Sequence, residues 1–413
     1  MFFNLDYANK LMETYKLDAL IATDCDTLKY LGYDAWINYT KEWMFKPGGD
    51  IAGAINNFCI IPLKNEPVYL LSADLFTFLE NFNSKIVYVY GDFKDKESKV
   101  EKNILLQSID RKINNVFERG VSNNLINALK LIFKKNNLLN SRIGIEKIGL
   151  NKDLFENIKI LFSKCEFIDA TEIFRILRMI KTQNELENIK KCAKITENAA
   201  IKSIQKIKPG NIFGDTIKTF NKAIMKENAV FDHYILLPKG LGCLSCEDYI
   251  IENNSIFGID VGAFLNNYVS DTALTIFIGT YSRKDIDIYK KLLEIMDNGF
   301  KSAKPGVFCS DIFHSMKAVQ KKYNLSKSIF EGHGIGISCR EYPIINKNLK
   351  YSYYDGVLER KADFIIEENM VFNIEVAWHI FNIKTFQIEK TFIITGLGCE
   401  ELEFQDRIEP IYI

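Results

Sequence analysis

An internal repeat in the second half of the chain constrains the fold more than any other feature. The segment Lys208-Pro-Gly-Asn-Ile-Phe-Gly-Asp215 is matched by Lys304-Pro-Gly-Val-Phe-Cys-Ser-Asp311. The copies lie roughly a hundred residues apart, which is too far for a solenoid and fits a duplicated half-domain. Each copy follows a predicted long helix and opens another, with its Asp in the first turn, where the helix dipole favours an acid. The repeat predicts two similar halves within one domain.

The chain has 413 residues, a length that favours two domains over one. Its first part alternates helical and strand patterns. The predicted helices cover 5–15 and 125–135, and the predicted strands cover 17–23, 57–62, 67–71, 86–90 and 142–146. We therefore predict an α/β domain over residues 1–168 and a second domain over residues 169–413.

Charge and cysteine usage limit the classes of partner and compartment. Lys plus Arg equals Asp plus Glu, at 53 each, so no net charge favours nucleic acid or an anionic membrane. The start of the sequence has no basic and apolar signal pattern, and no stretch approaches the length of a membrane span. Nine scattered cysteines, an odd number, indicate reduced thiols rather than a disulfide framework. We expect a cytoplasmic protein that binds neither nucleic acid nor membrane.

Four carboxylates and one histidine in the second domain lie in or beside apolar, strand-like runs. They are Asp260, Asp271, His333, Glu375 and Glu389. A carboxylate in such a run is costly unless it is paired or bound to a cation. If the five converge, two divalent ions would neutralise their repulsion. The oxygen-rich donor set suits Mn, Co, Fe or Zn.

The spacing of the acids indicates paired strands. Gly262 and two asparagines lie between Asp260 and Asp271, which predicts two strands joined by a turn. Glu375 and Glu389 also fit two paired strands. The alternatives are a hairpin with exposed acids for the first pair and a surface cross-strand pair for the second.

The five segments, in this order, resemble the pita-bread metallopeptidases, a family that includes methionine aminopeptidase, Xaa-Pro aminopeptidase, proline dipeptidase and creatinase. The family's Asp-x10-Asp, Gly-His-Gly-Ile-Gly, Ile-Glu and terminal Glu elements match the five positions, and the resemblance covers about the last 235 residues well. It implies an α/β N-terminal domain, followed by an α+β pita-bread (creatinase/aminopeptidase) catalytic domain with an internal pseudo-twofold repeat. It also implies two divalent metal ions, most readily Mn, held by the five residues at the junction of the halves.

Two of the departures from the family's pattern concern its usual histidines. Cys243 stands where the family usually has a histidine upstream of the first Asp, and Arg340 stands where a second histidine usually follows the Gly-His-Gly segment. Arginine cannot act as a base at neutral pH, but it can clamp a carboxylate through two hydrogen bonds. His233 could replace a missing histidine if the alignment slips there, with a structural role as the alternative. His379 shares strand parity with Glu375 and could line the pocket or pack.

We therefore predict a dinuclear metal-dependent hydrolase that cleaves a peptide or amide bond of a small substrate, similar to Xaa-Pro dipeptidase or aminopeptidase. Glu375, Arg340 and His379 are its candidate catalytic residues. The resemblance implies a homodimer. One alternative is a non-catalytic module on the same fold that binds metal or a partner. Another is a creatinase-like hydrolase of a non-peptide amide.

Overall fold

The computed structural model contains two compact units. It describes residues 3–33, 56–72, 86–91, 118, 120–240, 247–345, 353–354, 359–360, 363–402 and 409–413. Contacts between α-carbons separate Met1–Leu177 from Arg178–Ile413. The domain boundary predicted between residues 168 and 169 stays a prediction.

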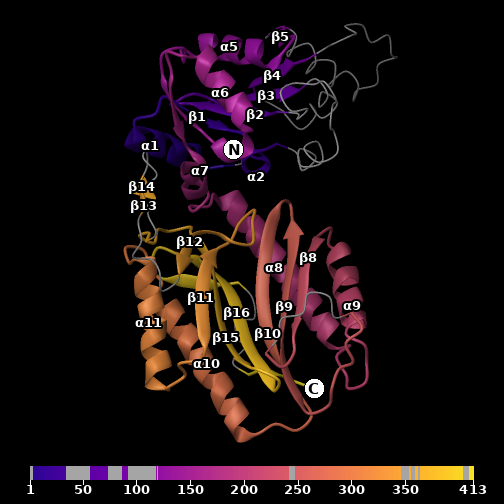
Figure 1. Ribbon diagram of the computed structural model, residues 1–413. Coiled ribbons are helices and arrows are strands. Elements are labelled where there is room, and N and C mark those ends of the chain that lie inside the picture. Colours follow the sequence, from indigo (N-terminus) through magenta and orange to yellow (C-terminus); the bar gives the residue numbers. More distant parts are fainter. Residues whose placement is uncertain are drawn as a thin grey trace, which may run out of the picture. The chain divides into compact units, whose positions relative to one another are not determined.

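The first unit is built on a seven-stranded sheet with the order β5-β4-β3-β2-β1-β6-β7 (Figure 1). Its strands are β1 (Ala19–Ala22), β2 (Phe58–Pro62), β3 (Val68–Ser72), β4 (Ile86–Tyr90), β5 (Val121–Ser122), β6 (Arg142–Ile145) and β7 (Glu166–Asp169). Its helices are α1 (Leu5–Tyr15), α2 (Cys25–Tyr30), α5 (Leu125–Lys135), α6 (Lys152–Leu161) and α7 (Thr171–Leu177), with a 3-10 turn η3 (Lys147–Gly149). Asn4 and Asn124 cap α1 and α5 by accepting backbone N–H bonds, so both predicted helices are confirmed.

The second unit is built on a nine-stranded sheet. Its main path has the order β12-β11-β15-β16-β10-β9-β8, with β17 paired to β16 and β18 to β10. Its strands are β8 (Val230–Leu237), β9 (Ser255–Leu265), β10 (Tyr268–Ile278), β11 (Ile329–Gly334), β12 (Glu341–Ile345), β15 (Val371–Ile380), β16 (Lys384–Ile394), β17 (Cys399–Glu401) and β18 (Ile411–Tyr412), and a separate pair is β13 (Tyr353–Tyr354) and β14 (Glu359–Arg360). Its helices are α8 (Gln183–Ile204), α9 (Gly214–Met225), α10 (Arg283–Ser302) and α11 (Cys309–Lys322).

The repeated segments occupy matching places in the two halves of this unit. The first joins α8 to α9 and the second joins α10 to α11, with Asp215 and Asp311 in the first helical turns. Gly210 and Gly306 adopt positive φ angles of 85° and 92°, which glycine tolerates best. Each segment also makes an isolated bridge, to Ile250 in one half and Ile365 in the other. The predicted duplication is confirmed at the level of helices and turns.

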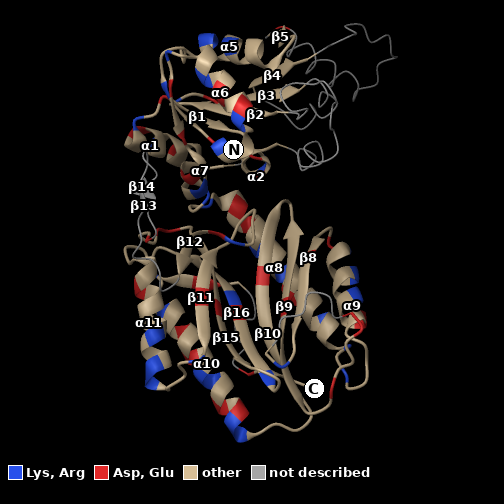
Figure 2. Cartoon of the chain, viewed as in Figure 1, with Lys and Arg blue, Asp and Glu red and all other residues tan. Residues whose placement is uncertain are grey.

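The helices pack against one face of the large sheet. Val261 on β9 belongs to a core cluster with residues of α8 and α9, and Ser270 on β10 accepts or donates a hydrogen bond with Thr196 of α8. Ile374 on β15 lies beside Gly299 of α10. Because side chains alternate along a strand, the neighbours of these residues face away from the helices. Figure 2 shows Lys and Arg along α9, α10 and α11 and acidic segments on the central strands. In the described part of the chain, no helix is long and apolar enough to cross a membrane.

Candidate metal centre

The predicted site residues lie in two adjacent rows on the face turned away from the helices. In the first row, Asp260 of β9 is paired with Ala273 of β10, which is paired with Glu389 of β16. Glu389 is paired with Glu375 of β15, and Glu375 with Glu331 of β11. Directly paired residues in antiparallel strands put their side chains on the same face. Strand register therefore gathers four acids along one line, and the exposed-acid alternatives do not describe them.

The second row is parallel to the first and consists of residues on the same face, two positions away from the first row on each strand. Asp271 of β10 is paired with Gly262 of β9, and His233 of β8 is paired with the same glycine. On the other side, Asn373 of β15 is paired with His333 of β11 and donates to the backbone carbonyl of Asp271, at 2.7 Å. This row places a histidine on each side of Asp271.

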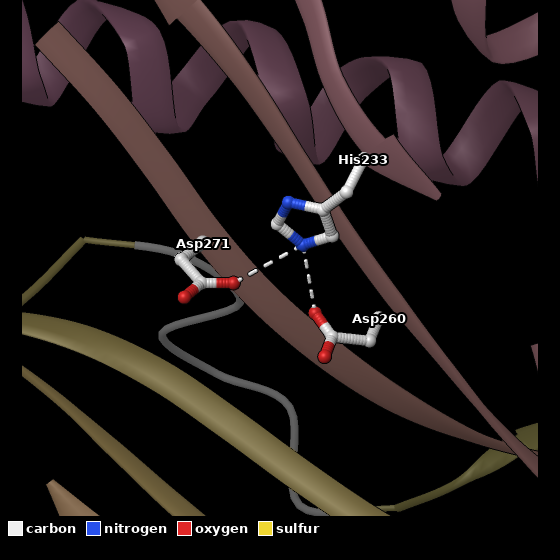
Figure 3. A group of neighbouring side chains, drawn as sticks. All are labelled: His233, Asp260 and Asp271. Carbon is white, nitrogen blue, oxygen red and sulfur yellow. Dashed lines mark hydrogen bonds and ion pairs between the residues drawn. The ribbon is translucent and has the colours of Figure 1, made fainter. Parts of the chain in front are cut away.

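Side-chain donors form two groups that share Asp271. In the first, Nε2 of His233 lies 3.0 Å from Oδ1 of Asp260 and 3.3 Å from Oδ1 of Asp271 (Figure 3). In the second, Nε2 of His333 lies 3.8 Å from Oδ2 of Asp271 and 4.0 Å from Oε1 of Glu389. Each group brings three potential ligand atoms within 4.8 Å of one another. The two oxygens of Asp271 thus face different groups.

Burial and mutual repulsion disfavour the ionised form of most of these acids. Burial, followed by the charge of Asp260, raises the pKa of Glu375 to about 7. Burial, followed by the charges of Asp271 and Asp260, raises the pKa of Glu389 well above its ordinary value. Burial also raises the pKa of Asp260. Burial opposes ionisation of Asp271 too, but the hydrogen bond from His233, the charges of His233 and His333 and the hydrogen bond from Cys339 together outweigh it and lower that pKa.

His233 is the main cationic partner of these acids. Burial alone would lower its pKa, but hydrogen bonds with Asp232, Asp260 and Asp271 raise the pKa to about 12. Its Nδ1 lies 2.7 Å from Oδ2 of Asp232. In the metal-free protein these hydrogen bonds therefore favour the protonated ring.

His333 is oriented for ligation. Its Nδ1 lies 3.1 Å from the carbonyl oxygen of Gly334, so donation from Nδ1 leaves the Nε2 lone pair directed at Asp271 and Glu389. A side chain at either flanking glycine would meet backbone: a Cβ at Gly332 would lie 2.8 Å from the carbonyl oxygen of Asn373, and one at Gly334 2.1 Å from that of Tyr342. Glycine at both positions therefore permits the close backbone approach.

The residues fit a divalent metal. Oε2 of Glu389 is buried and has no hydrogen-bond partner among the described residues. Three other carboxylates and two imidazoles are the ligand types that divalent transition ions prefer. A bound cation would satisfy the unpaired oxygen and offset the repulsion that raises the pKa values of Glu375 and Glu389.

Comparisons with known proteins agree with this arrangement. Residues 239–396 match the model of metallopeptidase family M24. This segment of the chain is similar to metallopeptidase family M24. The matched segment contains all five predicted ligands, and this match, together with the Xaa-Pro dipeptidase relatives, identifies a metallopeptidase-type hydrolase.

Individual relatives extend the match beyond this segment. The Xaa-Pro dipeptidase of Pyrococcus furiosus is 29% identical over 276 residues, which cover 64% of this chain and 74% of the relative. The prolidase structure from Pyrococcus horikoshii OT3 is 20% identical, with a TM-score of 0.67 and 98% of each chain covered. A dipeptidase structure from the same organism is 18% identical, with a TM-score of 0.72 and 99% of each chain covered. These structures confirm the predicted fold, an α/β N-terminal domain followed by a pita-bread domain.

Arg340 and His379, which were predicted to be catalytic, lie at different distances from Glu375. Arg340 hydrogen-bonds to Glu331, and its Nη2 lies 3.8 Å from Oε2 of Glu375. His379 is on the same face of β15 as Glu375, but four residues, about 13 Å of extended strand, separate them. Its Nδ1 is buried without a hydrogen-bond partner in the described structure, and burial lowers its pKa. Cys243 lies outside the described residues.

Sequence reasoning gave no role to several contacts of this centre, among them the bond that Sγ of Cys339 donates to Oδ2 of Asp271, at 2.9 Å. Glu331 ends the first row of acids, and Gln387 donates from Nε2 to Oε1 of Glu375 at 3.3 Å. Glu331 stands two residues before His333, so strand parity was a signal that could have placed it in the site. Gln387 stands two residues before Glu389 and offers the same signal.

The pKa shifts predict how pH affects the metal-free protein. The fold raises the pKa values of Glu375, Glu389 and Asp260 above their unfolded values, so their stabilising contributions decline as pH rises through the folded values. His233 acts in the same direction, because its contribution is complete below its unfolded pKa and declines as pH rises. The lowered pKa of Asp271 affects the stability of the fold only at acidic pH. In chelator, we expect the melting temperature to fall between about pH 5 and about pH 8.

A Glu375→Gln variant tests how much of this fall in melting temperature comes from the metal centre. It removes a carboxyl group whose pKa is raised to about 7, so its melting temperature should fall less than that of the wild type over the same range. Thermal melts in chelator measure both slopes. Identical slopes would contradict the assignment of this pH dependence to the acid rows.

Proposed function

We propose that this chain is a two-metal peptidase in which Asp260, Asp271, His333, Glu375 and Glu389 hold the ions. The shared position of Asp271 carries the proposal. Its Oδ1 faces the donors on β8 and β9, and its Oδ2 faces the donors on β11 and β16. A carboxylate that presents one oxygen to each of two donor groups is suited to bridge two cations.

Bound divalent ions would supply Lewis-acid polarisation of the scissile carbonyl and acidify a water molecule. The chain's own residues supply position and charge. Arg340 is held by Glu331 beside Glu375, with 57% of its side chain exposed. An exposed guanidinium at this point can bind a substrate carboxylate in a bidentate manner. We assign it to substrate positioning and not to proton transfer.

We infer a short peptide as the substrate, with an Xaa-Pro dipeptide as the first candidate. The name of the Pyrococcus furiosus relative supports this substrate class, and Arg340 supports a free carboxylate close to the scissile bond. We also propose Mn as the physiological metal, because the donor set contains four carboxylates. We further propose a homodimer in the cytoplasm. The described cysteines form no disulfide, in keeping with a reducing compartment.

Metal content and hydrolysis together test the proposal. Purified protein loaded with Mn or Co should contain two ions per chain by elemental analysis and should hydrolyse Xaa-Pro dipeptides. The Arg340→Ala variant should keep both ions and show a KM raised by about tenfold to a hundredfold, because it loses a charge-assisted bond to substrate. The same variant should discriminate less between a dipeptide and its C-terminal amide.

The alternative function is a metal-binding module without catalysis. It is favoured by the absence of a histidine at position 340. Two tightly bound ions without turnover across a broad panel of dipeptides, tripeptides and non-peptide amides would favour it over the peptidase. Turnover of a non-peptide amide alone would instead indicate a creatinase-like substrate.

A further inference from the structure

We propose that His233 is a sixth protein ligand of the metal centre, completing with Asp260 and Asp271 the donor set of one ion, and that Asp232 positions its ring. This inference rests on the proposed two-metal function. His233 precedes the segment matched by the family model, which begins at residue 239.

A β-bulge aims His233 into the site. Phe231 is paired with Ala263 and His233 with Gly262, so Asp232 is an extra residue in β8. In a regular register Asp232 would stand opposite Gly262 and His233 opposite Val261, where the ring would face the core beneath the sheet. Bulges are common beside active sites because they redirect a side chain. Here the bulge moves the ring from the helix-covered face to the face that carries the acids.

A glycine in the neighbouring strand makes room for the ring. A Cβ added at Gly262 would lie 2.4 Å from Cε1 and 2.7 Å from Nδ1 of His233. Any side chain at position 262 would therefore displace the imidazole. The two residues form a matched pair: the bulge brings the ring to this place, and the absent side chain at Gly262 allows it to stay.

The distances suit a common ion. Donors bound at about 2.1 Å to one ion lie about 3.0 to 3.4 Å apart in ordinary coordination geometries. Nε2 of His233 is 3.0 Å from Asp260 and 3.3 Å from Asp271 (Figure 3). Nδ1 lies 2.7 Å from Asp232. A carboxylate on the second ring nitrogen is a common orienting contact for a metal-bound histidine.

Each of the two donor groups then contains one histidine. His333 on β11 ends the second row on one side of Asp271, and His233 on β8 ends it on the other. Each ion would receive one imidazole in addition to carboxylates. This donor set should favour Co or Zn over Mn more than a site with a single histidine would.

Binding of Co²⁺ and Mn²⁺ to the full chain tests the inference. Calorimetry and elemental analysis would compare the wild type with His233→Ala, and visible absorption of the Co²⁺ form would report nitrogen ligation. We expect His233→Ala to lose one ion or to bind its weaker ion at least about a hundredfold less tightly, with a larger loss for Co²⁺ than for Mn²⁺. His314→Ala is the matched control, since His314 is an exposed histidine on α11.

Two further variants keep the test decisive if His233→Ala folds poorly. Asp232→Asn retains the ring and should weaken Co²⁺ binding by about tenfold to a hundredfold. Gly262→Ala retains the imidazole but displaces it, and it should change the Co²⁺ spectrum in the same direction as His233→Ala. Circular dichroism would establish that each variant is folded.

The outcomes separate this inference from the proposed function. If the wild type binds two ions and the folded variants bind both metals as tightly as it does, His233 is a counter-ion that metal displaces, and the inference is overturned. Tighter metal binding by His233→Ala would have the same meaning. If the wild type binds neither Co²⁺ nor Mn²⁺, the two-metal proposal itself fails.

Discussion

An Asp271→Ala variant is expected to lose both metal ions and at least about a thousandfold of peptidase activity. Metal ions contribute several kcal/mol of charge stabilisation in the transition state, and about 1.4 kcal/mol corresponds to a factor of ten in rate. Asp271 is the residue whose two oxygens face both donor groups. Its loss should therefore affect both ions, whereas loss of a terminal ligand such as Glu375 should mainly affect one.

Elemental analysis and dipeptide hydrolysis would measure this effect. Asp215→Ala is a matched control, since Asp215 is an exposed acid on α9 that pairs with Lys218. It should keep two ions and full activity. An Asp271→Ala protein that retains both ions at wild-type affinity would show that the donor groups do not share this carboxylate, and the two-metal arrangement would need another bridge.

Local sequence patterns were sufficient to predict several helices and strands and to single out the five acidic and histidine candidates. Helices α1 and α5 follow from apolar periodicity and asparagine caps, which involve neighbouring residues only. The repeated Lys-Pro-Gly segments predicted two halves because the same turn chemistry recurs before α9 and α11. Each acid was noticeable because ionised carboxylates are rare in apolar strands. These signals depend on neighbouring residues in the sequence and not on tertiary contacts.

The environment of His233 could not be predicted in the same way. Its direction depends on one extra residue in β8, and a bulge leaves no mark in an alternating pattern. Its partners lie on β9 and β10, so their approach depends on strand order and register. The same holds for Glu331 and Arg340, which meet Glu375 only because β11 is paired with β15. Register between distant strands is the information that single-sequence patterns lack.

A Gly334→Ala variant is expected to destabilise the fold by about 3 kcal/mol and to weaken metal binding. The added Cβ would lie 2.1 Å from the carbonyl oxygen of Tyr342 and 2.6 Å from its carbonyl carbon. Both atoms are backbone, so no rotamer change can relieve the clash, and β11 must move away from β12. The carbonyl of Gly334 also contacts Nδ1 of His333, so this movement would turn the imidazole.

Gly398→Ala is the control for this substitution. A Cβ at Gly398 has no heavy atom within 4 Å, so its effect should stay within about 0.5 kcal/mol. Denaturant unfolding in chelator would measure both variants against the wild type. Equal denaturation midpoints for Gly334→Ala and Gly398→Ala would show that β12 can move without loss of stability. Close backbone packing would then not require a glycine beside His333.

The dependence on metal concentration separates the clash from the loss of ligation. A steric clash alone lowers stability by the same amount with and without metal. A ligand that binds only the folded state adds stability that grows with its concentration relative to Kd. If Gly334→Ala also turns His333, its deficit relative to the wild type should widen as Co²⁺ is added. A constant deficit would confine the effect of Gly334 to packing between β11 and β12 and would leave the orientation of His333 to its other neighbours.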